Sequence, residues 1–268
     1  MAVRFSQMRP NDGFDGSASP NWQMVPVGGS KRVGLHGAAG LAVASSDTSI
    51  ATVASATAHG HTTLTITGVA KGNCQIQIGA GPAFAAVLDV AVKSRKTVST
   101  AFHYVDDGHR QKTRRRISDL NAMITAANNI LLPQANVEIS RRSAAALPIA
   151  QNLGRVVRFS SHLPGVPAAQ HEWDVVTSHA DATADFNVFF VVEYEQDATP
   201  LHDDTEAGTL GGSCIFEDNT GEPAGVTLAH ELGHHLGLGH SRNRHHLMAD
   251  SSGSGTQIPK ADADIINP

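Results

Sequence analysis

The stretch formed by residues 230–240 constrains this chain more than any other part of it. It reads His-Glu-Leu-Gly-His-His-Leu-Gly-Leu-Gly-His and fits the pattern HExxHxxGxxH at every fixed position. Residues four apart on a helix lie on the same face, so His230 and His234 can present two imidazoles to a single ion. Neutral imidazole suits zinc, and catalytic zinc usually has three protein ligands. The stretch therefore predicts a zinc-binding helix.

The third zinc ligand has to come from beyond this helix. His240 follows His234 by six residues and would leave the shared face if the helix continued. Gly237 accepts the left-handed conformation that ends a helix, so the chain can turn there and bring His240 to the metal. Glu231 lies one position from His230 and can act as general base without binding the metal. We therefore expect three histidine ligands and one catalytic glutamate.

Three further histidines lie close to the motif, in a chain that has 15 histidines in all. His235 is rotated by about 100° from the face of His234, and His245 and His246 lie in a polar run. We interpret these three as surface residues or as supports for the ligands. The alternative for the whole stretch is a histidine-rich helix without metal, and the length of the pattern argues against it.

A methionine follows the motif in residues 247–250, which read Leu-Met-Ala-Asp. With the long zinc motif, Met248 resembles the methionine-containing turn of the metzincin clan of zinc endopeptidases. The spacing from His240-Ser241 to Leu247-Met248 is most similar to the matrixin branch, and residues 208–214 resemble the strand and cysteine that precede the zinc helix in adamalysin-like members. The resemblance implies that Met248 forms a hydrophobic floor beneath the metal.

Two features depart from this family pattern. Ala249 and Asp250 follow Met248, so the chain has neither the tyrosine that serves some metzincins as an extra ligand nor the matrixin Tyr-Pro. Residues 251–256 stand where the family walls its specificity pocket, and they are rich in Gly and Ser. Their composition is that of a flexible segment, so they do not predict a substrate preference.

The length of 268 residues, with 41% hydrophobic and 17% charged residues, is typical of one large globular domain or two ordinary ones. Residues 1–21 contain no apolar run, so we expect a flexible N-terminal segment that is neither a signal peptide nor a membrane span. The longest apolar run elsewhere is far too short to cross a bilayer. We expect a secreted protein, exported without a visible signal peptide, for example as a bacterial toxin or effector.

Residues 22–94 alternate short apolar segments with Gly, Ser and Asp, as in a small β-sandwich. Residues 45–53 and 68–72 resemble the bacterial immunoglobulin-like group 2 domain. Such a domain implies a docking partner or an adhesive role, and an inert spacer is the alternative. The expected strands cover residues 25–27, 33–35, 41–43, 50–53, 64–66, 76–78 and 87–92.

Residues 95–268 show a different pattern, which agrees with an α+β metzincin-type zincin domain. The zinc helix is expected to start near Pro223, with Thr220 or Gly221 as its cap. Pro133 is expected to end the long amphipathic helix that precedes it. The remaining expected elements are a strand at 97–105, that amphipathic helix at 109–132, a strand at 137–140, a central buried strand at 186–194 and a short helix at 260–266.

Residues 210–216 are expected to form the sheet edge that borders the cleft, with Leu210, Gly211 and Gly212 as the substrate-binding edge. An exposed edge pairs with an extended peptide through main-chain hydrogen bonds. An ordinary edge strand is the alternative interpretation.

The net charge of −5 is distributed unevenly, because no Lys or Arg occurs between Phe159 and Ser241. A negative field over this interval favours cationic peptides and disfavours nucleic acid. We interpret the basic cluster of the long helix as a solvated face; it comprises Arg110, Lys112, Arg114, Arg115 and Arg116. A set of acidic residues raises calcium as a second metal, although no EF-hand spacing is present. They are Asp197, Asp203, Asp204, Glu206, Glu217 and Asp218.

The only two cysteines, Cys74 and Cys214, fall in different expected domains, so we expect buried thiols and no disulfide. Taken together, the sequence predicts a monomeric metalloendopeptidase that cleaves protein substrates by zinc-activated water, with Glu231 as base. One alternative is an adhesion or delivery module whose zinc site is silent or structural. Hydrolysis of cell-wall peptides is another.

Overall fold

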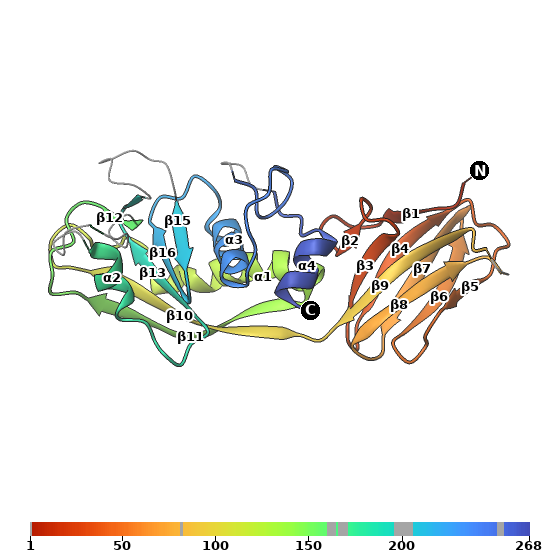
Figure 1. The fold of residues 1–268 in the computed structure, drawn as a ribbon, viewed down its shortest axis with the longest axis horizontal. Helices are drawn as coiled ribbons and strands as arrows, with labels where there is room; N and C mark the ends of the chain where they lie inside the picture. Colours follow the sequence, from red (N-terminus) through yellow and green to blue (C-terminus); the bar gives the residue numbers. More distant parts are fainter. Residues whose placement is uncertain (1, 81–82, 160–164, 166–170, 196–205, 251–254) are drawn as a thin grey trace. The chain divides into compact units, whose positions relative to one another are not determined.

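The computed structural model describes the chain except for residues 1, 81–82, 160–164, 166–170, 196–205 and 251–254 (Figure 1). The described residues form two compact units. The N-terminal unit comprises residues 1–96, 130–138 and 256–268, and the histidine unit comprises residues 97–129 and 139–255. The units thus interleave along the sequence, whereas the sequence predicts three consecutive segments, 1–21, 22–94 and 95–268. Together they make a multi-domain α+β protein.

The N-terminal unit contains two β-sheets, drawn in red to yellow in Figure 1. All seven strands predicted between residues 25 and 92 overlap an observed strand. One sheet has the order β1 (Arg4–Gln7), β4 (Ser30–His36), β7 (His61–Gly68), β6 (Ala51–Ala58). The other has the order β2 (Phe14–Asp15), β3 (Asn21–Pro26), β9 (Ala86–Lys93), β8 (Gly72–Ile78), β5 (Val43–Ser45).

Alternating side chains from both sheets form one shared core. In β7, Leu64 and Ile66 are fully buried and alternate with threonines. In β8, Ile76 and Ile78 are fully buried in the same core and alternate with glutamines. Phe5 of β1 joins this core, although residues 1–21 were predicted to be a flexible segment. The strands β1 and β2 are too short to show an alternating pattern in sequence, so only pairing with β4 and β3 reveals them.

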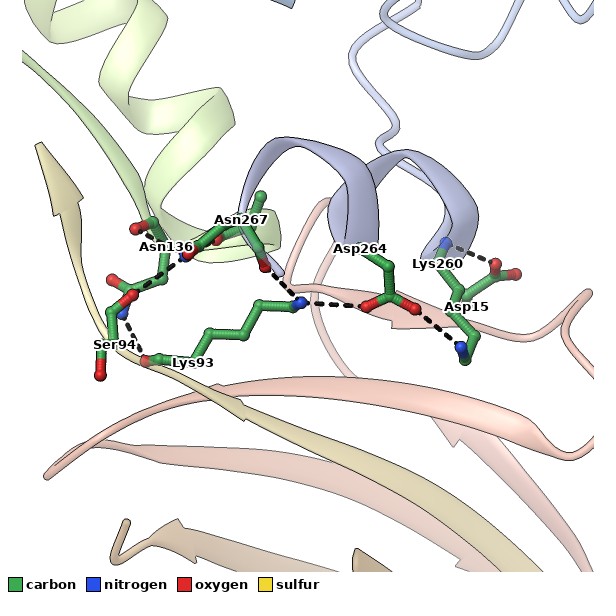
Figure 2. Close-up of polar contacts among 8 residues, drawn as sticks. Asp15, Lys93, Ser94, Asn136, Lys260, Asp264 and Asn267 are labelled. Carbon is green, nitrogen blue, oxygen red and sulfur yellow. Dashed lines mark hydrogen bonds and ion pairs between the residues drawn. The ribbon is translucent and has the colours of Figure 1, made fainter. Parts of the chain in front are cut away.

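The last helix, α4 (Lys260–Ile266), belongs to the N-terminal unit and has the predicted bounds. Figure 2 shows the polar contacts that hold it. Lys93 at the end of β9 donates from Nζ to Asp264 Oδ1 at 2.9 Å and to the carbonyl oxygen of Asn267 at 2.5 Å. The Asn267 amide donates to the carbonyl oxygens of Ser94 and Ala135 at 3.0 and 2.8 Å. The C-terminal residues are therefore fixed by buried polar bonds.

The sheet of the histidine unit has five strands; three neighbouring strands run parallel to one another, and the last strand is antiparallel to its neighbour. Its order is β11 (Val137–Pro148), β10 (Lys96–Asp106), β13 (Phe186–Val191), β16 (Ser213–Glu217), β15 (Ala207–Leu210). The strand β13 is buried at every position, as predicted for the centre of a sheet. A two-stranded sheet of β12 (Val157–Arg158) and β14 (Tyr194–Glu195) and the short helix α2 (Glu172–Thr177) complete this part.

The long helix α1 (Leu120–Ala135) starts eleven residues later than predicted, after a single 3-10 turn at Ile117–Asp119. The basic cluster that was expected on its face lies in the extended segment before it. The reason is tertiary: the backbone N–H of Arg114 donates to Asp218 Oδ2 at 2.7 Å, and the Arg115 guanidinium donates to the Glu217 carbonyl oxygen at 2.7 Å. These bonds replace the hydrogen bonds that a helix would offer this segment.

The other end of α1 also differs from the prediction. Pro133 lies inside the helix, which continues to Ala135. Asn136 then takes a left-handed conformation, with φ of 53°, and its N–H still bonds to the carbonyl oxygen of Leu132. The asparagine therefore ends the helix where the proline was expected to do so.

No described helix is both long enough and apolar enough to cross a membrane.

Candidate metal centre

The helix α3 (Ala224–His235) carries the first part of the histidine motif. It begins as predicted after Pro223, which is itself the N-cap, in place of Thr220 or Gly221. Its inner face buries Leu228 and Leu232 completely. A Cβ on Gly225 would overlap the Cβ of Ala126 in α1, so the glycine permits the close approach of the two helices. This packing fixes the helix that presents His230 and His234.

Three histidine rings converge at the end of α3. Nε2 of His230 lies 3.1 Å from Nε2 of His234, which lies 3.0 Å from Nε2 of His240. Each residue offers one nitrogen, and the three nitrogens all lie within 4.8 Å of one another. The chain turns back at Gly237, whose φ of 100° is unfavourable for other residues. The structure thus brings together the three histidines that the spacing selected.

Backbone carbonyls orient two of these rings. Nδ1 of His230 donates to the carbonyl oxygen of Leu247 at 2.8 Å, and Nδ1 of His234 donates to that of Leu238 at 2.9 Å. Because a carbonyl only accepts, the ring proton lies on Nδ1 and the Nε2 lone pair is free. Free lone pairs about 3 Å apart repel one another unless a cation lies between them. Tetrahedral zinc sets its ligand nitrogens about 3.3 Å apart, so the histidines fit zinc.

Burial keeps these imidazoles neutral. The pKa of His230 is lowered to about 4, chiefly by burial and also by the neighbouring His234 and His240, against the opposing effect of the Leu247 carbonyl. Burial also lowers the pKa of His234. Neutral rings are the form that binds a metal, so protons compete weakly for these two ligands at neutral pH.

The methionine-containing turn packs beneath the ligands. Met248 is buried, and a Cβ on Gly233 would overlap its sulfur, so the turn and α3 approach closely at this glycine. The N–H of Ser241 donates to the Met248 carbonyl oxygen at 2.6 Å, which ties the turn to the residue after His240. Sequence reasoning did not single out Gly233. Its only signal was a glycine in the middle of a helix, where it is disfavoured.

Glu231 is 5% exposed and lies in α3 next to His230. Its Oε2 accepts a hydrogen bond of 2.6 Å from the hydroxyl of Thr209 in β15. Burial raises the pKa of Glu231 to about 7, with a further contribution from the charge of Glu206, and the Thr209 hydroxyl opposes the rise. A carboxyl group with such a pKa both accepts and releases a proton near neutral pH.

The hairpin of β15 and β16 borders α3. Its strand β15 is the outermost of the sheet, and Leu210 is its last residue. Gly211 and Gly212, predicted with Leu210 as the substrate edge, form the turn of the hairpin, and the Gly211 carbonyl oxygen lies 3.2 Å from Nδ1 of His235. His235 also stacks on Phe186 with ring centroids 4.8 Å apart. Sequence reasoning missed Thr209 and gave His235 no specific role.

The two cysteines are separate buried thiols. Burial raises the pKa of Cys214 well above its ordinary value, and its sulfur lies 3.6 Å from the Ile215 carbonyl oxygen. Burial likewise raises the pKa of Cys74. Cys214 lies outside the histidine cluster that is able to hold a metal. Near that cluster, His246 contacts Ser241 and Asn243.

The acidic residues considered for calcium have protein partners where they are described. Glu206 accepts from the Glu222 N–H at 3.2 Å, and Asp218 accepts from Thr113 and Arg114. Asp197, Asp203 and Asp204 lie outside the described residues, as do residues 251–254 of the expected specificity segment. Calcium therefore stays a prediction.

The N-terminal unit has a hollow of about 580 Å3 beside α4. Polar and charged side chains border much of it, and it lies on the sheet of β3, β9 and β8. The polar and charged residues among its lining include Lys71, Asn73, Gln75, Asp89, Lys260 and Asp264.

No protein-family model matches the chain, and no curated protein matches it. Among solved structures, the chain is similar to archaemetzincin from Methanopyrus kandleri, with 15% identity and a TM-score of 0.41, over 64% of this chain and 93% of that one. It is also similar to domains 4 and 5 of the S-layer protein SbsC, with 24% identity and a TM-score of 0.22, over 26% of this chain. The chain spans 45% of the length of that S-layer fragment.

Proposed function

We propose that this chain is a zinc-dependent endopeptidase that hydrolyses peptide bonds of protein substrates. One observation carries the proposal: three histidine nitrogens converge within 4.8 Å of one another, and a buried glutamate directly follows the first of these histidines. A site that serves only structure needs no such base and usually has a fourth protein ligand. His230, His234 and His240 would hold zinc, and Glu231 would be the general base.

When bound, zinc supplies Lewis acidity toward a carbonyl oxygen and toward water. Glu231 accepts a proton from the attacking water at its carboxylate and passes the proton to the leaving amine nitrogen. The pKa of about 7 suits both transfers. The Leu247 and Leu238 carbonyls hold the His230 and His234 rings in the tautomer that leaves Nε2 free. Met248 supports the helix from below by packing on Gly233.

The substrate in this proposal is an extended peptide that pairs with the edge strand β15. The free side of an edge strand offers main-chain donors and acceptors to such a peptide. The hydrogen bond from Thr209 to Glu231 places this strand beside the base. Because residues 160–240 include no Lys or Arg, cationic peptides are the favoured class.

Cleavage of unfolded casein by the full chain tests the proposal, with zinc content measured on each sample. Wild type should bind one zinc per chain and cleave, and a chelator should abolish cleavage. Glu231→Ala should retain zinc and lose at least about 100-fold in rate, since general-base catalysis contributes about 10²- to 10⁴-fold. Full activity of the zinc-loaded Glu231→Ala variant would remove Glu231 from the mechanism.

The second candidate is an adhesion or delivery module, and the hollow beside α4 in the N-terminal unit is the feature that favours it. Purified bacterial cell wall separates the candidates. Soluble peptide fragments released by wild type and not by Glu231→Ala indicate hydrolysis of wall peptides. Equal binding of both proteins to the wall, without release, indicates adhesion. An exported bacterial effector remains the proposed setting for either activity.

A further inference from the structure

We propose that Thr209 is a positioning residue that holds Glu231. Its hydrogen bond to Glu231 is one of two that fix the hairpin of β15 on the helix α3. The other joins His235 to the Gly211 carbonyl oxygen. The geometry stands by itself, and its kinetic consequence rests on the proposed peptidase function.

The two bonds join neighbouring points of the hairpin to α3. Thr209 lies in β15, and Gly211 begins the turn that follows it. Glu231 and His235 are four residues apart on a helix, which spans about 6.0 Å. The hydroxyl of Thr209 donates to Glu231 at 2.6 Å, and Gly211 and His235 lie 3.2 Å apart. The two bonds therefore tie the end of β15 and the turn after it to α3.

The apolar environment of Glu231 makes its carboxylate depend on the hydrogen bond from the Thr209 hydroxyl. The neighbouring helix positions Leu228 and Leu232 are buried apolar residues, and Cys214, which pairs with Thr209 across the hairpin, is a fully buried thiol. In the described part of the chain, the Thr209 hydroxyl is the hydrogen-bond donor to the Glu231 side chain. A buried carboxylate is costly without a donor, so this bond selects the side-chain orientation of Glu231.

The same strand then serves two purposes. Its outer edge is where the proposed peptide pairs, and its Thr209 side chain holds the base. A shift of β15 relative to α3 consequently changes both the register of the scissile bond and the position of Glu231. Misplacement of a catalytic group by about 1 Å can cost about 100-fold in rate.

The test compares Thr209→Val, which removes the hydroxyl at nearly constant shape, with Thr209→Ser, which keeps it. Thr100→Val is the matched control, because Thr100 is a buried threonine of β10 whose hydroxyl bonds to the Val98 carbonyl oxygen. Each variant is prepared as the full, zinc-loaded chain. Zinc content, kcat and KM on a peptide substrate and a crystal structure are determined for each.

We expect Thr209→Val to lose about 10- to 100-fold in kcat with zinc content unchanged and KM within about threefold of wild type. Thr209→Ser and Thr100→Val should stay within about threefold of wild-type kcat. In the crystal structures, the Glu231 carboxylate should leave its wild-type position in Thr209→Val and keep it in Thr209→Ser. An unchanged Glu231 orientation in Thr209→Val, or an equal loss of kcat in Thr209→Ser, would overturn the inference.

The two proposals fail in different ways. If the zinc-loaded wild type cleaves no peptide, the peptidase function fails, and the orientation of Glu231 in the crystal structures alone decides the role of Thr209. If wild type cleaves and Thr209→Val is equally active, the peptidase function stands and the role of Thr209 is refuted.

Discussion

The two units each bury a charged side chain and stabilise it in opposite ways. In the N-terminal unit, Lys93 is 4% exposed, and its ammonium group contacts the Asp264 carboxylate and the Asn267 carbonyl oxygen (Figure 2). In the histidine unit, Glu231 is as deeply buried, and its donor is one neutral hydroxyl. Burial alone would raise the pKa of Asp264, but hydrogen bonds from Lys260 and Lys93 lower it below its ordinary value. The pKa of Glu231 is instead raised to about 7.

The two environments suit different roles: the paired charges fix a geometry, and the unpaired carboxylate is able to exchange a proton. A buried ion pair with both partners in place keeps its protonation state and fixes a geometry. A buried carboxylate without an opposite charge lies near the balance point between its two protonation states, which proton transfer requires. The network around α4 is therefore expected to respond to mutation in stability, and the histidine site in activity.

The largest expected effect is the loss of metal in His230→Ala. Removal of one of three ligands should reduce bound zinc from one per chain to nearly none and abolish cleavage, as measured by metal analysis and a peptide assay. His246→Ala is the control, because His246 contacts Ser241 and Asn243 outside the ligand set and should retain zinc. Normal zinc in His230→Ala would remove His230 from the ligands.

Asp264→Asn should weaken the N-terminal unit and leave cleavage unchanged. It leaves the Lys93 ammonium buried without its carboxylate, at a cost of roughly 1 kcal/mol, moderated because the Asp264 side chain is 39% exposed. Urea unfolding, followed by Trp22 fluorescence in a Trp173→Phe background, reports on this unit. The double variant Lys93→Met/Asp264→Leu should recover much of the loss, because it removes both charges. Unchanged stability of Asp264→Asn would contradict the structural role of the pair.

The stability difference between wild type and Asp264→Asn should depend on pH. Because folding lowers the pKa of Asp264, its contribution is present above the ordinary value of 3.8 and is lost as the pH falls through the lowered value. The difference in free energy of unfolding should therefore be largest at neutral pH and should disappear as the pH falls below about 3.8. Urea unfolding of both proteins at several pH values measures it. A difference that persists in acid would show that the asparagine perturbs packing and not charge.

The smallest effect is expected for His235→Phe, which keeps a ring against Phe186 and removes the bond to Gly211. The strand β15 would keep Thr209 as its other tie, so kcat should be nearly unchanged and KM should rise about twofold. Steady-state kinetics on a peptide distinguishes this pattern from that of Thr209→Val. A fall in kcat as large as in Thr209→Val would mean that the position of Glu231 depends on both hydrogen bonds.

Local patterns predicted most strands and the histidine cluster. Alternation located the seven strands between residues 25 and 92, and the motif spacing selected the histidines that converge. The start of α1 was wrong because Asp218 and Glu217, more than 100 residues away in sequence, bind the segment of Arg114 and Arg115. Its end was wrong because Asn136 accepts the left-handed conformation that terminates the helix.

The sequence by itself determined which histidines converge, because helical periodicity and one flexible glycine, Gly237, leave few ways to arrange His230, His234 and His240. Only the tertiary structure decided what surrounds Glu231 and Lys93. The Thr209 hydroxyl and the Asp264 carboxylate come from elements distant in sequence, and no local sequence pattern predicts that they contact Glu231 and Lys93. Burial and long-range hydrogen bonding, which depend on the packed chain, raise the pKa of Glu231 and lower that of Asp264.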